Sequence, residues 1–222
     1  MKRTLEELLE ELKDKGVSEK TLNAMRIIKR EYFVINKEEA YLNEALPFLN
    51  QTTSQPLVIA NIIDELDLTE EDVVIEAGTG SGYQTCLLAL LSKKVHSFEI
   101  DKQILEKGKE NILNFIKQHP HLKMKITLYR KDIFNADDIL INILKEEGKI
   151  DKVVFSFSIK EIPKFFLKEI NNPITIIAPM EENQPNKNQK YQKLKKIIKQ
   201  NNKIITKDLG YVSFVKERRE NK

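Results

Sequence analysis

The chain has a single cysteine, no long hydrophobic run and almost no excess of one charge over its 222 residues. Because one cysteine, Cys86, excludes an internal disulfide, we expect the protein to be cytoplasmic. No apolar run approaches the roughly 20 residues that cross a membrane, and the charged N-terminus lacks the apolar stretch of a signal peptide. Basic residues number 37 against 34 acidic ones, and a net charge of +3 does not by itself indicate a nucleic-acid partner.

Length and composition predict one folded domain. Hydrophobic residues make up 41% and charged residues 32%, which suits a chain that builds its core without disulfides or metal. We treat 1–222 as a single domain and expect a monomer. Its parts are the N-terminal helices with an adjoining segment (1–55), a central core (56–180), and a C-terminal hairpin and tail (181–222).

Strand and helix patterns alternate regularly through the central core. Repeated units of this length predict a three-layer, Rossmann-like, doubly wound α/β fold with a mostly parallel sheet and right-handed crossovers. Ligands of such sheets bind at the carboxyl ends of the strands. The expected strands are 72–77, 94–100, 124–129, 150–157 and 173–178, and the expected helices are 57–66, one around 87–91, 102–117, 136–147 and a short one after Pro163.

Helices are also expected before the core. Thr4 and Glu7 form a possible capping box, Gly16 stops the first helix, and Ser18 opens a second. Between 32 and 56 the periodicity disappears, and the aromatic residues there indicate a packed, irregular segment.

The C-terminal part permits two interpretations. Apolar residues at 191–200 have helical spacing, but a strand paired with 204–215 is equally compatible with the sequence. The polar residues 181–189 are expected to form a loop.

The most informative motif is Val73-Val-Ile-Glu-Ala-Gly-Thr-Gly-Ser-Gly-Tyr83, a strand pattern that runs into a glycine-rich loop and then a helix. Glycine at 78, 80 and 82 permits positive φ and close approach of a ligand to the backbone. The carboxylate of Glu76 would repel a phosphate but attract a ligand with a cationic amino acid end. The motif therefore predicts a site for S-adenosylmethionine.

Two acids follow later strands. Glu99 ends the second strand about 20 residues past the loop, where an acid typically bonds ribose hydroxyls; we favour this interpretation over a solvated acid. Asp132 follows the third strand and is placed to meet the adenine amino group. An acid that caps a helix beside Asn135 explains Asp132 nearly as well.

Hydroxyl and amide groups are dense in Asn50-Gln-Thr-Thr-Ser-Gln-Pro56. Taken alone, this segment predicts a helix start with Ser54 as the N-cap and Pro56 in the first turn. A binding role explains the same residues equally well.

These motifs together resemble the protein-L-isoaspartate O-methyltransferase family. The resemblance is carried by QTTSQP at 51–56, VVIEAGTGSGYQT, Phe98-Glu-Ile and the ending DLGYVSFV at 208–215, and it extends over nearly the whole chain from the N-terminal helices. It implies the seven-stranded methyltransferase fold with a C-terminal antiparallel strand pair. It also implies S-adenosyl-L-methionine as cofactor and methyl transfer to the free carboxylate of L-isoaspartyl residues in damaged proteins, a protein repair reaction.

The resemblance assigns roles to residues. Ser54 and Thr53 would orient the substrate carboxylate by hydrogen bonding without acting as nucleophiles. Because the carboxylate attacks and the sulfonium leaves readily, positioning out of water supplies most of the acceleration, which fits the lack of an obvious His or Cys catalyst. The residues expected to bind the cofactor are Glu76, Gly78, Thr79, Gly80, Ser81, Gly82, Glu99, Ile100 and Asp132.

The chain also departs from the family pattern. Phe155-Ser-Phe-Ser-Ile-Lys160 replaces a run of small residues beside the substrate pocket, so Phe157 and Ile159 are expected to narrow or reshape it. Asn50 replaces a glycine, and Lys131-Asp-Ile133 replaces Gly-Asp-Gly near the adenine. Two alternatives therefore stay open: a methyltransferase with another acceptor, such as tRNA, and a catalytically silent protein that binds the cofactor.

Other conspicuous residues favour structural roles. His119-Pro-His121 has no cysteine or acid at metal-ligand spacing, so we expect no metal site. His96 is expected to lie in a strand, either packed or exposed at the sheet edge, and Cys86 is expected to be a small core residue on an apolar helix face. The lysines between 187 and 203 have only Tyr191 among them for base stacking, so we expect a solvated face without a nucleic-acid partner.

Overall fold

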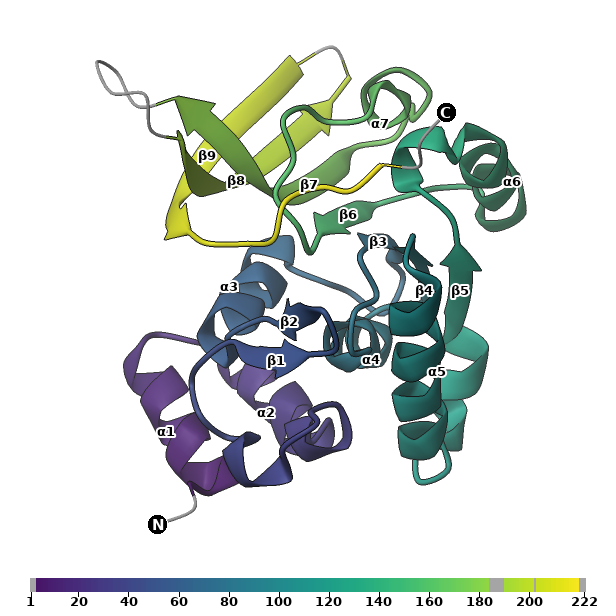
Figure 1. The fold of residues 1–222 in the computed structure, drawn as a ribbon. Helices are drawn as coiled ribbons and strands as arrows, with labels where there is room; N and C mark the ends of the chain where they lie inside the picture. The colour runs from purple at the N-terminus through teal and green to yellow at the C-terminus, as the bar shows by residue number, and fades with distance from the viewer. Residues whose placement is uncertain (1–2, 184–189, 202, 220–222) are drawn as a thin grey trace.

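The computed structural model describes residues 3–183, 190–201 and 203–219. The core of the molecule is a seven-stranded sheet in the order β5-β4-β3-β6-β7-β8-β9, and Figure 1 shows its twist. The strands from β5 to β7 in this order are parallel, and β8 runs antiparallel to both of its neighbours. The expected fold and its C-terminal antiparallel pair are confirmed. The strands are β3 (Val73–Ala77), β4 (Lys94–Glu99), β5 (Ile126–Arg130), β6 (Lys152–Phe155), β7 (Ile174–Asn183), β8 (Lys190–Gln200) and β9 (Lys203–Val212).

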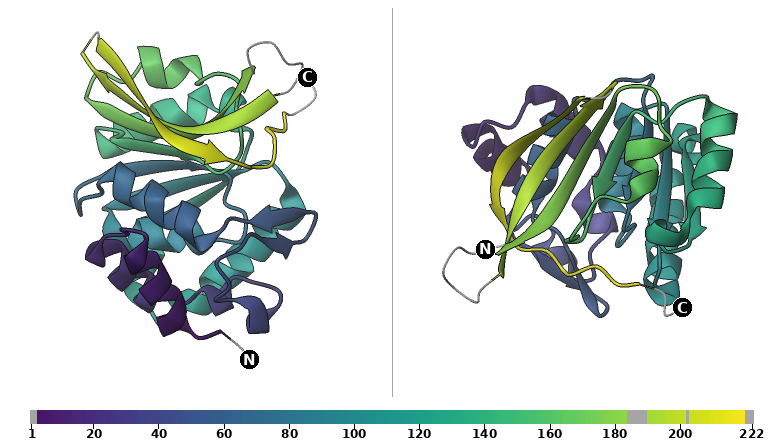
Figure 2. Two further views of the ribbon diagram at one scale, coloured as in Figure 1. Left: turned by 90° about the vertical axis from the view of Figure 1, so that its left-hand side faces the viewer. Right: turned by 90° about the horizontal axis from the view of Figure 1, so that it is seen from above.

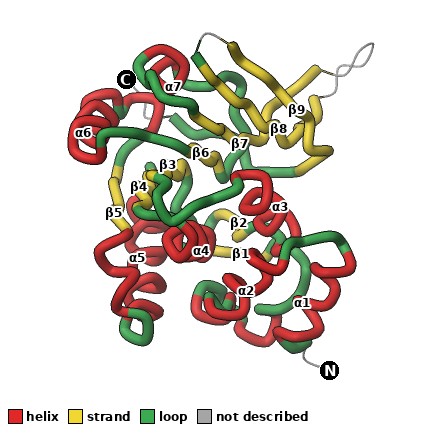
Figure 3. The backbone as a smooth tube through the Cα atoms, turned by 180° about the vertical axis from the view of Figure 1, so that it is seen from behind, coloured by secondary structure: helices red, strands yellow, loops and turns green. Residues whose placement is uncertain are grey.

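Helices cover both faces of the sheet (Figures 2 and 3). Val74 and Val154 face a core cluster with α1 to α5, whereas Ile75 and Val153 face a second cluster with α6 and α7. Burial on both faces explains why these strands are almost continuously apolar. Among the described residues, no helix is long and apolar enough to cross a membrane. The α-helices are α1 (Leu5–Asp14), α2 (Glu19–Ile27), α3 (Pro56–Leu66), α4 (Tyr83–Leu91), α5 (Lys102–Ile116), α6 (Asp137–Glu147) and α7 (Lys164–Lys168).

The N-terminal helices begin as their sequence predicts. Thr4 and Glu7 form a reciprocal capping box at the start of α1. Gly16 follows α1 with φ of 89°, which favours glycine, and Ser18 caps α2 through the N–H of Thr21.

Segment 32–56 is more ordered than its sequence suggests. It contains the strands β1 (Leu46–Phe48) and β2 (Gln51–Thr53), which form an antiparallel hairpin. The 3₁₀ helix η1 (Arg30–Tyr32) leads into it, and η2 (Lys37–Glu39) lies within it. Two strands of three residues each carry too few positions to show a period of two in the sequence.

Residues 191–200 belong to strand β8, which decides the alternative that the sequence left open. Leu194 and Ile197 have helical spacing, but they belong to the core clusters on opposite faces of the sheet. An odd spacing has that result in a strand, because side chains alternate between faces. A register shift between Lys193 and Lys195 also breaks the regular pairing with β9.

Two boundaries in the core differ from expectation. Strand β6 ends at Phe155, two residues before the expected 157, so the chain already turns beside the pocket. Strand β7 continues to Asn183 through ten antiparallel pairs with β8, into the stretch 181–189 that was expected to be a loop. The remaining residues of that stretch, 184–189, lie outside the described part of the chain. Shorter 3₁₀ turns are η3 (Pro120–Lys125) and η4 (Ile133–Asn135).

Candidate active site

A pocket opens at the carboxyl ends of β3, β4 and β6, and its space, counted out to the open mouth, is about 900 Å³. Strand order reverses at this point, because β4 lies on one side of β3 and β6 on the other. Ligands of doubly wound sheets bind at such a switch point. The predicted residues that line the pocket are Thr53, Ser54, Gly78, Thr79, Gly80, Ser81, Glu99, Ile100 and Asp132.

The glycine loop has the backbone that its sequence predicts. Gly78, Gly80 and Gly82 have φ of 98°, 53° and 86°. Nothing lies within 4 Å of a Cβ built on Gly80, so the space that a side chain would fill is open to a ligand. Gly82 does not line the pocket, and it is the N-cap of α4. A Cβ on Gly82 would meet the Ile112 side chain at 2.5 Å, so this glycine serves close packing against α5.

Helix α5 holds the glycine loop from behind. The carbonyl oxygen of Gly80 would lie 2.3 Å from a Cβ on Gly108, so only glycine permits this approach. Asn111 Nδ2 donates to the Ser81 carbonyl at 3.1 Å. Neither residue was predicted as part of the site. A glycine inside a helical pattern often marks close packing, and Gly108 shows that signal.

Glu99 lines the pocket and also organises its rim. Its carboxylate accepts from the N–H of Gly80 and the N–H of Asp101, both at 3.1 Å. Burial raises the pKa of Glu99, while these backbone N–H groups act in the opposite direction. A carboxylate fixed in this way at the end of β4 is suited to accept hydrogen bonds from ribose hydroxyls.

Asp132 combines both roles weighed for it. It lines the pocket and is 2% exposed. Its two oxygens accept from Phe134 N and from Asn135 Nδ2, each at 3.0 Å, so it caps η4. The carboxylate of Asp132 is therefore held in one position at the pocket by these two hydrogen bonds.

Glu76 does not line the pocket. It is fully buried beneath the glycine loop and accepts from Thr85 Oγ1 at 2.5 Å and Ser97 Oγ at 2.7 Å. Gln84 Nε2 donates to its other oxygen at 3.0 Å. Burial raises the pKa of Glu76 to about 7. Gln84 lines the pocket, so it is the group through which Glu76 reaches the site.

The hydroxyl segment reaches the glycine loop. Ser81 Oγ lies 3.4 Å from Thr53 Oγ1, and Ser54 lines the same pocket. The N-cap of α3 is Gln55, with no side-chain capping bond, so the interpretation of Ser54 as N-cap is wrong. Asn43 takes over that function, because its Oδ1 accepts from Leu57 N at 3.1 Å.

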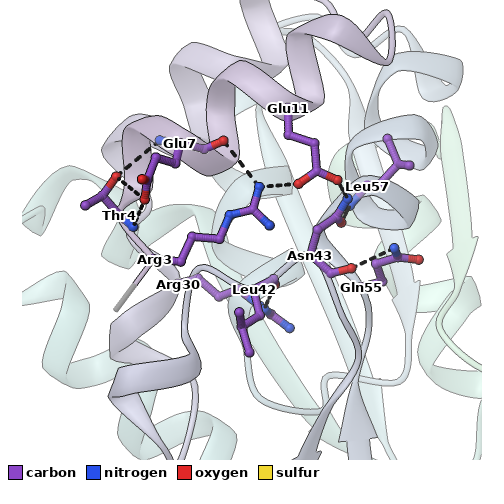
Figure 4. Close-up of polar contacts among 9 residues, drawn as sticks. All are labelled: Arg3, Thr4, Glu7, Glu11, Arg30, Leu42, Asn43, Gln55 and Leu57. Carbon is purple, nitrogen blue, oxygen red and sulfur yellow. Dashed lines mark hydrogen bonds and ion pairs between the residues drawn. The ribbon is translucent and has the colours of Figure 1, made fainter. Parts of the chain in front are cut away.

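Figure 4 shows how Asn43 is anchored. Its Nδ2 donates to Glu11 Oε1 at 2.7 Å, and its carbonyl accepts from Gln55 Nε2 at 2.8 Å. Arg3 forms an ion pair with the same glutamate. Through Asn43, helix α1 thus fixes the turn that leads into α3. Because Asn43 caps α3, the Ser54 side chain is not needed as a cap.

Arg30 organises the chain that carries Ser54. Its guanidinium is 1% exposed and donates to the carbonyl oxygen of Ser54 at 3.1 Å. Burial lowers the pKa of Arg30 to about 10. Its planar group binds four backbone oxygens at once, which a lysine could not reproduce. The other three carbonyls, at 3.0 to 3.1 Å, are those of Ala40, Leu42 and Glu44.

The chain after β9 covers one side of the pocket. Figure 1 shows it, in yellow, crossing from β9 towards α6. Ser158 N donates to the Val215 carbonyl at 2.7 Å, and Glu217 N donates to the Ser158 carbonyl at 2.9 Å. Val215 and Arg218 line the pocket, and Arg218 lies 3.5 Å from Asp101. We call residues 213–219 the C-terminal strap.

The two bulky departures behave differently. Phe157 lines the pocket and lies 3.3 Å from where a Cβ of Gly78 would be, so it narrows the pocket beside the glycine loop. Ile159 is fully buried in the core beneath α6 and α7, so the expectation that it shapes the pocket is wrong. Because β6 ends early, Ile159 pairs with Met180 of β7 and points into the core.

The remaining candidates have structural partners. His119 stacks on Phe115 at 4.4 Å, and no group of three or more potential metal ligands occurs among the described residues. Cys86 is fully buried, and burial raises the pKa of its thiol. His96 is 2% exposed.

Several lysines of the C-terminal hairpin are paired with acids. Lys193 lies 2.6 Å from Asp208, and Lys196 lies 3.1 Å from Glu65. Lys195 forms an ion pair with Glu182. These pairs neutralise much of the basic stretch that a nucleic-acid backbone would need.

The fold and the pocket define a Rossmann-like protein whose glycine loop lies at the switch point where such sheets bind their ligands. Residues 3–221 match the protein-L-isoaspartate(D-aspartate) O-methyltransferase (PCMT) family, and the chain belongs to this family.

Named relatives agree with the family match. Protein-L-isoaspartate O-methyltransferases from Dictyoglomus turgidum and Thermosipho melanesiensis are each 32% identical to the chain and are aligned over 94% of it. The alignments cover 88% and 98% of those proteins. A β-aspartate methyltransferase (PCMT) from Plasmodium falciparum, crystallised with S-adenosyl-L-homocysteine, shares the fold with a TM-score of 0.79 at 24% identity. That match covers 96% of this chain and 98% of the other.

Proposed function

We propose that the protein transfers the methyl group of S-adenosyl-L-methionine to the free carboxylate of L-isoaspartyl residues in damaged proteins. The observation that carries this proposal is the meeting of two separate motifs in one pocket. Thr53 Oγ1 lies 3.4 Å from Ser81 Oγ of the glycine loop, and Ser54 lines the same wall. A cofactor on the loop and an acceptor on the hydroxyl segment would therefore meet in one cavity.

The pocket residues fit this cofactor. Glu99 presents a fixed carboxylate for ribose hydroxyls, and Ile100, Ile104 and Ile133 give the pocket apolar surface for an adenine ring. Gly80 leaves open the space that a side chain would fill. S-adenosylmethionine supplies a methyl group on a positively charged sulfur, which is a good leaving group.

The chain contributes positioning. Ser54 and Thr53 donate hydrogen bonds to the substrate carboxylate and fix its direction, and Arg30 holds the Ser54 backbone. The C-terminal strap excludes water from one side. Alignment of the substrate carboxylate with the methyl group, together with exclusion of water, accounts for the acceleration, so a general base is not required.

The direct test uses two peptides that differ only in one linkage. Labelled S-adenosylmethionine is incubated with a peptide containing L-isoaspartate and with the same peptide containing aspartate. We expect a base-labile methyl ester on the isoaspartyl peptide alone. The absence of transfer, with cofactor binding intact, would reject the proposal, and methylation of tRNA in a parallel sample would identify the other acceptor class.

Ser54→Ala tests the role of the hydroxyl. A hydrogen bond to a charged group contributes about 1.5–3 kcal/mol, so we expect kcat/KM for the isoaspartyl peptide to fall about 10–100-fold. Cofactor affinity should not change. Thr206→Ala is the matched control, since Thr206 is exposed in β9 and outside the pocket wall, and it should retain full activity.

The partners that we propose are proteins and peptides that contain isoaspartate. We further propose that the protein acts as a monomer in the cytoplasm, where a single buried thiol suits a reducing compartment. The paired lysines of the C-terminal hairpin give no support to a nucleic-acid partner.

A further inference from the structure

Both amide protons of Gln84 are already used. Its Nε2 donates to Glu76 Oε1 at 3.0 Å and to Ser156 Oγ at 2.9 Å. The nitrogen faces Glu76, because a Glu76 carboxyl oxygen is the acceptor of this bond. Glu76 therefore decides which end of the Gln84 amide points away from it.

The oxygen of the amide points into the pocket. No described residue donates to Gln84 Oε1. The fully enclosed polar side-chain atoms that lack a partner in the described chain are Arg30 Nε, His96 Nε2 and Ser158 Oγ, so Gln84 Oε1 is not enclosed. Gln84 lines the pocket, and its oxygen is thus an open acceptor there.

Ser156 provides the complementary group. Its Oγ accepts from Gln84, and no described residue accepts its proton. It lines the pocket beside the glycine loop, with its Cβ 3.1 Å from where a Cβ of Gly78 would be. Next to the acceptor of Gln84 there is therefore a hydroxyl donor.

We propose that Gln84 Oε1 and Ser156 Oγ bind the α-amino acid end of the cofactor, and that Glu76 is a positioning residue that acts through Gln84. An acceptor suits the ammonium group, and a donor suits the carboxylate. The proposal rests on S-adenosylmethionine as cofactor but not on the identity of the methyl acceptor.

This arrangement replaces the direct contact that the sequence predicted for Glu76. A carboxylate in the pocket would attract the ammonium group but repel the adjacent carboxylate of the same ligand. A neutral amide with a fixed direction separates the two functions, and the buried Glu76 maintains that direction through three donors. These three hydrogen bonds hold the Glu76 carboxylate, and through it the Gln84 amide, in one geometry.

The test compares two ligands on several variants by calorimetry. S-adenosylhomocysteine has the amino acid end, and methylthioadenosine lacks it. For Gln84→Leu we expect S-adenosylhomocysteine to bind about 10–100-fold more weakly, and methylthioadenosine to change less than about twofold. Glu76→Gln should show the same selective loss, because a glutamine at this position permits the Gln84 amide to turn over. Gln118→Leu, at an exposed glutamine outside the pocket wall, should change neither ligand.

Equal losses for both ligands, or no loss for either, would overturn the proposal, since a residue that only packs the loop does not distinguish them. A ligand-side measurement covers the case in which Gln84→Leu fails to fold. Deaminated S-adenosylhomocysteine should bind the unmodified protein at least about tenfold more weakly than S-adenosylhomocysteine. Equal affinity of these two would also refute the role of Gln84. These outcomes are independent of the peptide assay, which tests the acceptor.

Discussion

At the scale of single residues, burial separates polar groups that serve the pocket from those that serve only the core. Glu76, Glu99 and Arg30 are all nearly inaccessible, and each is surrounded by partners that hold a backbone or side chain at the pocket. His96 is equally buried but lies away from it. Its Nδ1 lies 3.0 Å from Tyr129 Oη, and its Nε2 has no hydrogen-bond partner although it lies 3.5 Å from Glu147.

His96 should make the fold sensitive to acid. Burial lowers its pKa to about 4 from 6.5, so the unfolded chain binds more protons between these values. Stability that is complete above pH 6.5 is therefore lost as the pH falls towards 4. Between pH 7 and 5 we expect a loss of about 2 kcal/mol that His96→Gln does not show. Urea unfolding of both proteins at the two pH values measures the difference; the same pH dependence in both would contradict this account.

At the scale of elements, helix α5 and the glycine loop form one unit. Gly108 admits the Gly80 carbonyl, and Asn111 binds the Ser81 carbonyl. The loop was recognisable in sequence because its glycines follow a strand directly. The residues of α5 that support the loop were not recognisable in sequence, because Gly108 and Asn111 stand about 30 residues further along the chain. Only the path of the chain through β4 brings α5 behind the loop.

Gly108→Ala has two opposing effects on stability: alanine has the higher helix propensity, but its Cβ would clash with the glycine loop. In an exposed helix this change would stabilise by about 1 kcal/mol. Here the new Cβ would meet a backbone oxygen at 2.3 Å, so we expect net destabilisation of about 1–3 kcal/mol and weaker binding of S-adenosylhomocysteine. Lys109→Ala, the exposed neighbour in the same helix, should change unfolding by less than about 0.5 kcal/mol. A stabilised Gly108→Ala protein would show that the loop moves away at little cost.

At the scale of the whole molecule, the pocket is closed by parts of the chain that are far apart in sequence. The hydroxyl segment comes from the N-terminal part, the glycine loop from the core, and the strap from the C-terminus. Arg218 lies near Asp101 at the start of α5, and Ser158 binds the strap backbone on both sides. The site is therefore complete only when the full chain is folded.

Truncation after Val212 removes the C-terminal strap and should weaken cofactor binding without preventing folding. The sheet retains all its strands, so we expect cooperative unfolding to persist. Loss of the Val215 contact and entry of water should weaken S-adenosylhomocysteine binding by at least about tenfold. Truncation after Arg219 is the control and should retain affinity. Unchanged affinity in the shorter chain would show that the strap does not contribute to the cofactor site.

The sequence by itself determined the alternation of strands and helices in the central core, the parallel strands there and the glycine loop, because each depends on local periodicity and on backbone conformations that glycine permits. It also marked the hydroxyl segment as unusual. Only the tertiary structure decided what those side chains do. In the structure Glu76 lies behind Gln84, and Asn43 caps helix α3 in place of Ser54. Residues 190–200 form strand β8 of the sheet. The physical reason is that a hydrogen-bond partner depends on proximity in space, which local sequence patterns do not contain.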